Sequence, residues 1–330
     1  MRLVQITHPS VRRRVALVDG SKLRLLGSHR SIYAFALSSV ETGCKLQELI
    51  LSDVSDVVLD YDEVYSHASE WTFLPSFDHP TEPARCLVSG TGLTHLASAA
   101  RRDAMHAADS VTDSIRMYQL GLEQGKPAPG ETGAAPEWFY KGTGTILRGH
   151  GAPLTVPNFA EDGGEEPEMA AAYIIDHDGN PRRIGLTPAN EFSDHKIEKQ
   201  NYLYLAHSKL RPCSIGPELV LDSDFSLVHG EVTIERDAEI VWKRAISTGE
   251  QRMCHSLANI EHHHFKYEEH RRSGDAHVHF LGADAFSFGD GIALENGDHM
   301  VIQWTGYGRA LRNPVHIDRT PVKPVSAEAL

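Results

Sequence analysis

The chain has 330 residues, of which 41% are hydrophobic, and it carries a formal net charge of −13 at pH 7. This length and composition predict a folded globular protein with one large or two smaller domains, and they exclude a disordered chain. The negative charge argues against nucleic acid or an anionic membrane as a partner, and neither an export signal nor a span of roughly 20 apolar residues is found, so a soluble, cytoplasmic protein is expected.

The first predicted elements are a hairpin and a helix. Residues 11–26 form two strand-like runs around Asp19-Gly20, a dipeptide typical of tight hairpin turns. Residues 31–51 have apolar side chains at helical spacing, and Gly43 is expected to interrupt that helix. The chain therefore opens with a small segment of β and α structure.

A connector rich in proline and glycine, residues 125–136, follows one or two predicted helices in residues 94–122. We place a domain boundary in this connector because such residues favour turns and break regular elements. Residues 1–130 are thus predicted to be a smaller N-terminal α/β domain, a hairpin plus helices, that could act as a lid.

After the connector, short strand-like runs alternate with turns, as in residues 220–221, 231–234, 239–242 and 300–304. Short, evenly spaced strands favour a folded-over sheet rather than a parallel sheet with crossover helices. We therefore predict a mainly β fold with α structure (α+β), in which residues 137–318 form a mixed β-roll and β-barrel catalytic domain. The tail, residues 319–330, lacks periodicity and is expected to be disordered or to take part in a dimer.

Two acidic residues, Glu166 and Glu168, stand at the entrance to the apolar run of residues 169–175. Because side chains alternate along a strand, both carboxylates should leave the same face. Two carboxylates this close raise each other's pKa unless a cation lies between them, and oxygen ligands of this kind suit Mg²⁺ or Mn²⁺. On spacing alone, an acidic turn before a strand is the alternative interpretation.

Further motifs extend this pattern along the chain. Gly185-Leu186-Thr187-Pro188-Ala189-Asn190-Glu191-Phe192-Ser193 follows the strand, and Lys209 stands eighteen residues after Glu191, shortly before a Gly-Pro turn. The other matching runs are Phe139-Tyr140-Lys141-Gly142-Thr143-Gly144, Leu294-Glu295-Asn296-Gly297-Asp298 and residues 306–315. In this order and spacing, the chain resembles the fumarylacetoacetate hydrolase superfamily over roughly residues 137–316.

The resemblance implies that Glu166, Glu168 and Glu191 hold a divalent metal ion, Mg²⁺ or Mn²⁺. Two positions depart from the family's pattern. Glu191 stands where the family usually has aspartate, which keeps the charge and lengthens the side chain by one methylene. Leu281-Gly282-Ala283-Asp284 stands where hydrolase members have a Thr-Gly-Thr-Pro-like turn, which argues against hydrolase chemistry.

Such a metal site would suit a small anionic 2-oxo acid, whose carboxylate and keto oxygens can chelate the ion and whose C3 protons then become acidic. Lys209 is expected to remove or return such a proton, since burial and a nearby cation both lower the pKa of a lysine. Glu198 falls on a helix-like stretch where hydrolase members often place a glutamine, so it is expected to act on distal hydroxyls of the substrate. Four further residues are predicted to bind substrate: Lys141, Gly142, Thr143 and Gly282.

One scaffold of this kind could dehydrate a substrate with a C4 hydroxyl or hydrolyse the C3–C4 bond of a substrate with a C4 carbonyl. Hydrolase members activate water with a His-x-x-Glu dyad, for which the nearest candidate here is His106 with the shorter Asp109; ordinary helix-surface positions for His95 and His106 are the alternative. The chain thus most resembles the branch that contains 2-keto-3-deoxy-pentonate dehydratases of pentose oxidation.

That resemblance implies a homodimeric lyase that converts a 2-keto-3-deoxy-pentonate to 2-oxoglutarate semialdehyde and water through a metal-chelated enolate. The first alternative is an acylpyruvate or 2,4-diketo acid hydrolase that uses the same metal site. The second alternative is a non-catalytic binding module, since a fold can persist without its chemistry.

Histidines and cysteines offer competing metal sites. His277 and His279 would share one face of a strand and could bind zinc or iron, but no third ligand follows in a recognisable pattern. Residues 260–270, which include three consecutive histidines, are better interpreted as an amphipathic helix. The four cysteines form no Cys-x-x-Cys pair, so neither a disulfide framework nor a structural zinc site is expected.

Overall fold

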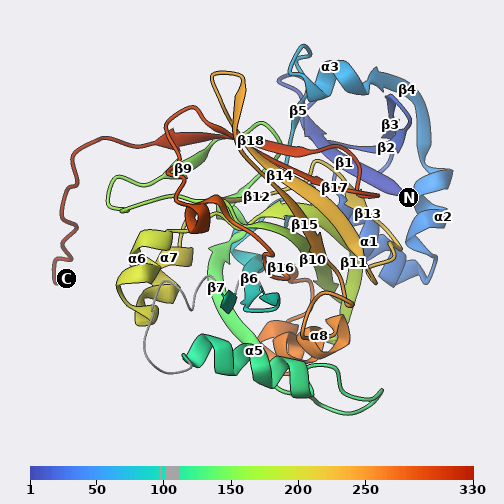
Figure 1. The fold of residues 1–330 in the computed structure, drawn as a ribbon. Helices are drawn as coiled ribbons and strands as arrows, with labels where there is room; N and C mark the ends of the chain where they lie inside the picture. Colours follow the sequence, from blue (N-terminus) through green and yellow to red (C-terminus); the bar gives the residue numbers. More distant parts are fainter. Residues whose placement is uncertain (97–98, 101–111) are drawn as a thin grey trace.

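Strands dominate the computed structural model, which describes residues 1–96, 99–100 and 112–330. Within these residues the strands form a 13-stranded sheet and a 5-stranded sheet (Figure 1). The prediction of a mainly β fold with α structure, folded over into more than one sheet, is confirmed.

The elements before the connector are β1 (Arg2–Thr7), β2 (Arg14–Asp19), β3 (Lys22–Leu26), α1 (Ile32–Thr42), α2 (Leu46–Ser52), β4 (Val54–Asp60), α3 (Tyr61–Tyr65), β5 (Thr72–Phe73), η1 (Pro83–Arg85), β6 (Cys86–Gly92) and α5 (Asp113–Gln124). The strands after it are β7 (Glu137–Thr143), β8 (Leu147–Arg148), β9 (Leu154–Val156), β10 (Pro167–Ile175), β11 (Pro181–Asn190), β12 (Cys213–Ile215), β13 (Leu219–Val220), β14 (Val228–Arg236), β15 (Glu239–Thr248), β16 (Ala276–Phe280), β17 (His299–Trp304) and β18 (Leu311–Ile317). The helices after it are η2 (Gly144–Ile146), α6 (His195–Gln200), η3 (Tyr202–Tyr204), α7 (Leu205–Lys209), α8 (Leu257–Phe265), η4 (Glu268–Arg271) and η5 (Ser287–Asp290).

Local sequence explains the first elements. Strands β2 and β3 pair as an antiparallel hairpin in which Asp19 lies opposite Lys22, and Gly20 adopts a φ of +59° in the turn, so the predicted hairpin is confirmed. The side chain of Ser31 accepts a hydrogen bond from the Ala34 N–H and caps α1, and Gly43 ends that helix with a φ of +71°. The predicted helix of residues 31–51 is therefore two helices, interrupted where the glycine predicted it.

Strand β10 lies in the middle of the large sheet, between β11 and β16, and all nine of its residues are buried. Met169, Ala171 and Tyr173 face one hydrophobic core, whereas Ala170 and Ala172 face the other. The five-stranded sheet, ordered β15-β14-β17-β18-β9, contributes its own buried side chains to the first of these cores. The start of β10 is thus held between two packed layers, which places Glu166 and Glu168 in the interior.

The large sheet runs in the order β4-β3-β2-β1-β13-β11-β10-β16-β6-β7, with β5, β8 and β12 beside this path. Strand β1 pairs with β13, and β6 pairs in parallel with β16, so strands from before and after the connector alternate in one sheet. The division into domains at residues 1–130 and 137–318, and the role of the first as a lid, stays a prediction.

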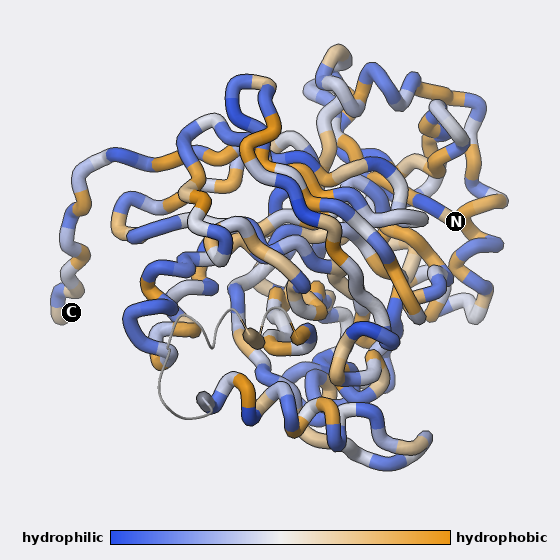
Figure 2. The backbone as a smooth tube through the Cα atoms, in the orientation of Figure 1, coloured by the Kyte–Doolittle hydropathy of each residue, from blue (hydrophilic) through white to orange (hydrophobic). Residues whose placement is uncertain are grey.

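The later predicted strands, the tail and one predicted helical segment are also found in the structure. The predicted strands of residues 220–304 correspond to β13, β14, β15 and β17, and the tail, residues 319–330, contains no helix or strand and is exposed almost throughout. Helix α5 lies in the predicted helical segment of residues 94–122 and beyond it, while part of that segment lies outside the described residues. Figure 2 shows apolar and polar residues alternating along α5, as expected for an amphipathic helix at the surface.

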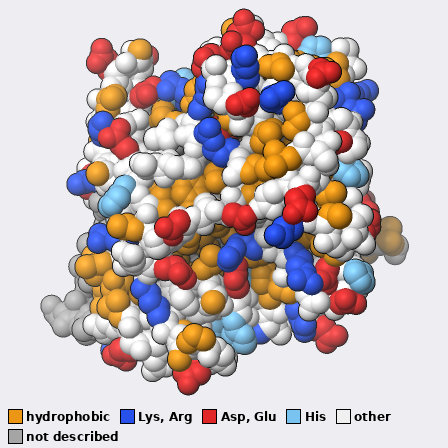
Figure 3. All heavy atoms as spheres, turned by 90° about the vertical axis from the view of Figure 1, so that its right-hand side faces the viewer, with side chains coloured by type: hydrophobic (Ala, Val, Ile, Leu, Met, Phe, Trp, Pro, Cys, Tyr) orange, Lys and Arg blue, Asp and Glu red, His pale blue; other side chains and the backbone are white. Residues whose placement is uncertain are grey.

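The surface carries charged side chains of both signs (Figure 3), and the described helices are short. On the face in Figure 3, basic and acidic side chains are interspersed, so this face offers no broad basic surface for nucleic acid. Within the described ranges, no helix is long and apolar enough to cross a bilayer.

The histidines of β16 form a buried cluster with His264 of α8. His264 Nε2 lies 3.0 Å from His277 Nδ1, and His279 bonds the hydroxyls of Ser89 and Thr91 at 2.9 and 2.7 Å. Both β16 histidines contact His264, which confirms that they share a face. Burial lowers the pKa of His277 to about 4 and that of His279 to about 3.

We expect this cluster to make the protein sensitive to acid. A histidine with a pKa near 6.5 when unfolded and about 4 when folded takes up protons preferentially in the unfolded chain, so its contribution falls as the pH drops from about 6.5 to about 4. Each such histidine should lower the free energy of unfolding by about 2 kcal/mol at pH 5 relative to pH 7. Urea unfolding at several pH values measures this, and a His277→Gln variant should have a flatter profile. An unchanged profile in that variant would contradict the assignment.

Candidate metal centre

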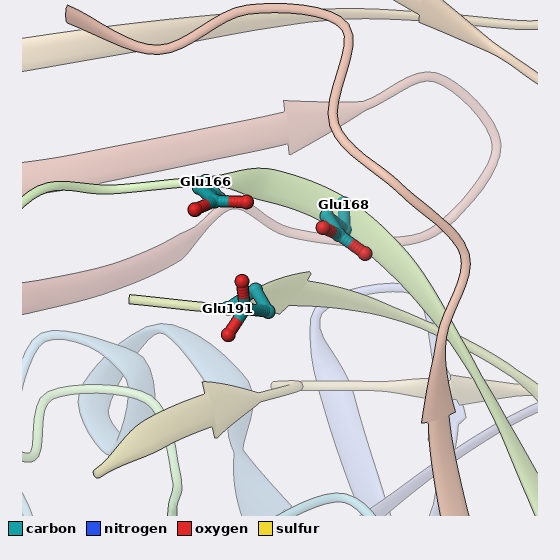
Figure 4. Close-up of side chains that lie close together, drawn as sticks. All are labelled: Glu166, Glu168 and Glu191. Carbon is teal, nitrogen blue, oxygen red and sulfur yellow. The ribbon is translucent and has the colours of Figure 1, made fainter. Parts of the chain in front are cut away.

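The pairing of β10 and β11 brings three carboxylates together. Pro167 lies opposite Asn190 in the two strands, so Glu166 just precedes β10, Glu168 lies within it and Glu191 just follows β11. The Glu191 N–H donates to the Glu166 carbonyl oxygen at 3.0 Å and fixes these ends side by side. Figure 4 shows Glu166 where the chain enters a strand, Glu168 on that strand, and Glu191 beside them at the neighbouring strand end.

These carboxylates form a compact and buried group. Each of the three offers one oxygen such that all three oxygens lie within 4.8 Å of one another, and the residues are at most 8% exposed. Among the residues that the structure describes, this is the one cluster of three or more carboxylate, imidazole or thiol ligands at such spacing. The structure therefore brings together the three residues predicted as metal ligands.

Lys209, at the end of α7, joins this group. Its Nζ donates to Glu166 Oε1 and Glu191 Oε2, both at 2.7 Å, and to Ser193 Oγ at 2.9 Å, and it lies 3.2 Å from Glu198 Oε1. The Lys209 side chain is buried, and its ammonium lies 5.0 Å from the centre of the Phe139 ring. Burial raises the pKa of Glu166, but Lys209 and His195 outweigh it and hold that pKa well below its usual range.

Lys141, predicted to bind substrate, lies on the other side of Glu191. Its fully buried ammonium contacts Glu191 Oε1 and donates to the carbonyl oxygens of Phe192 at 2.8 Å and Lys209 at 3.0 Å. An ammonium has three N–H donors, and three acceptors surround this one. In the described structure Lys141 therefore holds Glu191 and the two backbone segments in place.

Glu168 differs from its two neighbours in its partners. Its Oε2 accepts a 2.6 Å hydrogen bond from the Gly282 N–H, and no ion pair joins it to a lysine or arginine within the described parts of the chain. Burial raises the pKa of Glu168 well above its usual range, and the charges of Glu191 and Glu166 raise it further. A carboxylate in this position is stabilised by an added cation.

The charges around the centre fit a divalent cation. Glu198 adds a fourth carboxylate to the group, and Lys141 and Lys209 supply two ammonium charges. With all four carboxylates ionised, the state that a bound cation favours, two negative charges remain before the imidazole of His195 is counted. The three nearest ligand groups are all carboxylates, and oxygen donors of this kind suit a hard ion such as Mg²⁺ or Mn²⁺.

The loop after β16 also donates hydrogen bonds to the acidic residues of this region. The Ser287 N–H and hydroxyl donate to Glu165 at 2.6 and 2.8 Å, and Gly282 supplies the hydrogen bond to Glu168. Gly282 has a φ of +98°, and a Cβ at this position would lie 1.9 Å from Thr94 Oγ1. Only glycine fits this backbone, which is why its N–H can reach the carboxylate.

A Gly282→Ala variant should therefore be destabilised and should bind a metal ion more weakly. We expect a loss of about 2–4 kcal/mol, since strain at positive φ adds to a steric clash. Urea unfolding and calorimetric metal titration measure the two effects. Gly297→Ala is the matched control, because Gly297 has a φ of +95° but no atom within 4 Å of the added Cβ. Equal losses in both variants would mean that the clash with Thr94 is not important.

The remaining predicted residues have different positions. Glu198 lies on α6, as the helix-like pattern predicted, and accepts a 2.5 Å hydrogen bond from Ser208 Oγ beside Lys209. Gly142 and Thr143 end β7, where Thr143 Oγ1 lies 3.0 Å from Thr145 Oγ1, and no hydrogen bond between either residue and the three carboxylates is found in the described structure. Their contact with substrate stays a prediction. His106 lies outside the described residues.

Three residues of this site were missed in the sequence. In the sequence, Glu165 belongs to an acidic run, Ser193 ends the motif around Glu191, and His195 lies in none of the matching motifs. Ser193 Oγ bonds Glu191 Oε2 at 2.9 Å, and His195 Nε2 lies 3.1 Å from Glu166 Oε1. Their one available signal was proximity to Glu191 in the chain, which cannot tell which way a side chain points once β11 has ended.

Two curated proteins match part of the chain in sequence. A probable 2-keto-3-deoxyxylonate dehydratase of Haloferax volcanii is 31% identical over 179 residues, which are 52% of this chain and 58% of that protein. A 2-dehydro-3-deoxy-D-arabinonate dehydratase of Saccharolobus solfataricus is 28% identical over 122 residues, which are 36% of this chain and 40% of that protein. The matches thus span less than two thirds of either relative. No protein-family model matches the chain.

Solved structures match nearly the whole chain in fold. A structure of 2-keto-3-deoxyarabinonate dehydratase has a TM-score of 0.73 at 19% identity and covers 97% of this chain and 100% of that one. A structure of 2-keto-3-deoxy-D-arabinonate dehydratase complexed with magnesium and 2,5-dioxopentanoate has a TM-score of 0.71 at 20% identity, with the same coverage. A 2-hydroxyhepta-2,4-diene-1,7-dioate isomerase from Mycobacterium marinum has a TM-score of 0.59 at 16% identity, again over 97% of this chain and 100% of that one.

The chain thus shares its fold with solved structures of 2-keto-3-deoxyarabinonate dehydratase and of a 2-hydroxyhepta-2,4-diene-1,7-dioate isomerase, and its three-carboxylate centre agrees with the resemblance predicted from the sequence. Both of the partial sequence matches, and the highest of these TM-scores, are with dehydratases of 2-keto-3-deoxy-pentonates.

Proposed function

We propose that this protein is a lyase that removes water from a 2-keto-3-deoxy sugar acid, a 2-keto-3-deoxy-pentonate, with the help of a divalent metal ion. The observation that carries the proposal is the buried group of Glu166, Glu168 and Glu191 with the Lys209 ammonium 2.7 Å from two of them. This group lies in a fold shared with 2-keto-3-deoxyarabinonate dehydratase. The sequence similarity to two dehydratases supports the same reaction class.

Glu166, Glu168 and Glu191 would hold the metal ion, Mg²⁺ or Mn²⁺. When bound, the ion would supply positive charge to the carboxylate and keto oxygens of a 2-oxo acid, which makes the C3 protons more acidic. Glu191 is one methylene longer than the aspartate usual in this family. The ammonium groups of Lys141 and Lys209 on either side of its carboxylate offset the charge of that carboxylate and fix its direction.

Lys209 is the residue that we assign to proton transfer at C3. It is buried among carboxylates, within reach of a substrate held at the centre, and a lysine so placed can exchange a proton with Glu166, Glu191 or Glu198 before it acts. Glu198 and the Ser208 hydroxyl bonded to it would face the distal hydroxyls of the substrate, where a carboxyl group can protonate the departing C4 hydroxyl.

The reaction is balanced by the loss of one water. Removal of a C3 proton supplies the electron pair for a C3–C4 double bond while the C4 hydroxyl leaves as water. A proton then leaves C5 while one adds to C3, which gives an enol with a C4–C5 double bond. The enol hydroxyl loses its proton while another adds to C4, so that C5 becomes an aldehyde. The product is 2-oxoglutarate semialdehyde, which is also called 2,5-dioxopentanoate.

Proton NMR tests this proposal directly. The purified protein is incubated with Mg²⁺ and, in separate tubes, with a 2-keto-3-deoxy-pentonate or a 2,4-diketo acid. An aldehyde signal from the first substrate supports the dehydratase. Pyruvate released only from the second would replace it with a hydrolase, and silence in both tubes, with no deuterium exchange at C3, would favour a binding module.

The assembly and location of the protein belong to this proposal. We expect a homodimer, as the resemblance implies, acting on a small anionic 2-oxo acid in the cytoplasm. Light scattering coupled to size-exclusion chromatography measures the mass in solution. A mass of 36.5 kDa, that of one chain, would contradict the dimer.

A further inference from the structure

Glu166 contacts two different donors through one of its oxygens. Its Oε1 lies 2.7 Å from Lys209 Nζ and 3.1 Å from His195 Nε2. A carboxylate whose one oxygen is held by two donors cannot rotate freely, so the direction of its other oxygen, Oε2, is fixed. Oε2 is then the oxygen that remains for a metal ion between Glu166, Glu168 and Glu191.

The ring of His195 is itself held firmly. It stacks on Phe286 and lies tilted against Phe288, with ring centres 4.8 and 5.2 Å away, and it is 1% exposed. On another side the backbone of Gly164 passes so closely that a Cβ there would lie 2.3 Å from His195 Nδ1. Packing on these sides holds the ring in one orientation, in which Nε2 points to Glu166.

The backbone before this ring is also fixed. Asp194 caps α6 by accepting a hydrogen bond from the Ile197 N–H at 3.1 Å, and its other oxygen accepts from Arg211 at 3.0 Å. Asp194 also receives the N–H of Glu161 at 3.0 Å, which ties α6 to the segment just before Glu166. These hydrogen bonds therefore fix the backbone at the start of α6, where His195 is the first residue.

From this geometry we infer that His195 is a positioning residue for Glu166, which turns the carboxylate so that one oxygen faces the metal ion. The inference rests on the metal site of the proposed function and adds a residue to it. Hydrogen-bonded partners of metal ligands typically change metal affinity by about 10–100-fold when they are removed. His195 acts here through a hydrogen bond and not through contact with the substrate.

Two substitutions separate the hydrogen bond from the packing. His195→Phe keeps an aromatic ring against Phe286 and Phe288 but removes the donor. His195→Gln removes the ring but places an amide N–H close to the position of Nε2. The matched control is His207→Phe, the same change on an exposed residue of α7.

Calorimetric titration of the metal-free protein with Mn²⁺ measures the affinity, and electron paramagnetic resonance of bound Mn²⁺ measures the symmetry of the site. We expect His195→Phe to weaken binding by about 10–100-fold, His195→Gln to recover most of this loss and His207→Phe to bind as the unsubstituted protein does. Recovery by glutamine identifies a positioning role, because a merely structural ring would not be replaced by an amide. A thermal melt checks that each variant is folded, and if His195→Phe does not fold, His195→Leu with the glutamine variant makes the same comparison.

The experiment distinguishes a failure of the role of His195 from a failure of the proposed metal centre. Unchanged Mn²⁺ affinity in His195→Phe, with loss of binding in Glu168→Gln, would overturn the role of His195 and leave the metal centre intact. Absence of saturable Mn²⁺ binding in the unsubstituted protein would overturn both.

Discussion

A Glu168→Gln variant is expected to lose metal-dependent turnover by more than ~100-fold, because removal of a ligand should exceed the cost of removing a hydrogen-bonded partner of a ligand. Its stability should not fall. Glu168 is buried, pairs with no cation in the described structure and has a pKa raised by burial and by two neighbouring carboxylates. The neutral amide of glutamine removes that repulsion and can donate to Glu166 and Glu191.

Two measurements check this expectation, the rate of product formation with Mg²⁺ and urea unfolding in EDTA. A carboxyl group with a raised folded pKa makes the folded protein less stable as the pH rises through the unfolded value near 4.3 toward the folded value. That contribution should be present in the unsubstituted protein and absent from the variant. Glu239→Gln, on an exposed residue of β15, is the matched control. Full turnover in Glu168→Gln would refute the site assignment.

The second large effect is expected from Lys209→Met. Loss of a general acid or base lowers turnover by about 10²–10⁴-fold. The substitution also leaves Glu166 and Glu191 with less positive charge near them, and breaking a buried ion pair costs about 3–5 kcal/mol. Since a metal ion can provide the missing charge, the loss of stability should be large in EDTA and smaller in saturating Mg²⁺.

Urea unfolding with and without Mg²⁺ measures this difference, and NMR measures the turnover. Lys209→Arg keeps the charge but moves it, so this variant should stay folded and remain inactive even if Lys209→Met does not fold. Lys22→Met, on an exposed residue of the first hairpin, is the control. Turnover near that of the unsubstituted protein in Lys209→Arg would mean that the lysine acts only through its charge.

Much of the fold was accessible from the sequence because its signals are local. Gly20, in the turn between Asp19 and Lys22, adopts a φ of +59° that suits a tight hairpin, and Gly43 ends a helix because it adopts a positive φ at little cost. The pairing of β6 with β16 was not accessible, since it joins residues 86–90 to 276–280 and depends on the packing of both faces of the sheet. A short apolar run predicts a strand but does not indicate which other strand will pair with it.

The same difference between local and long-range signals holds for the site. Glu166, Glu168, Glu191 and Lys209 were found because a motif fixes their spacing, and the structure places all four within one buried group. Lys141 was predicted at the site, but its contacts with Glu191 and two carbonyl groups depend on how three segments meet. His195 follows the same rule, because the rings that hold it come from residues more than ninety positions later in the chain.

The alternation of early and late strands in the large sheet has a consequence for how the protein is made. Arg2 lies opposite Val220, and Cys86 lies opposite Ala276, so the N-terminal strands have no partners on that side until much of the chain has left the ribosome. Contacts between residues so far apart in sequence form slowly, and unpaired strand edges invite association with other chains in the meantime. The yield of folded protein should therefore depend on the rate of synthesis and on chaperones more than its final stability suggests.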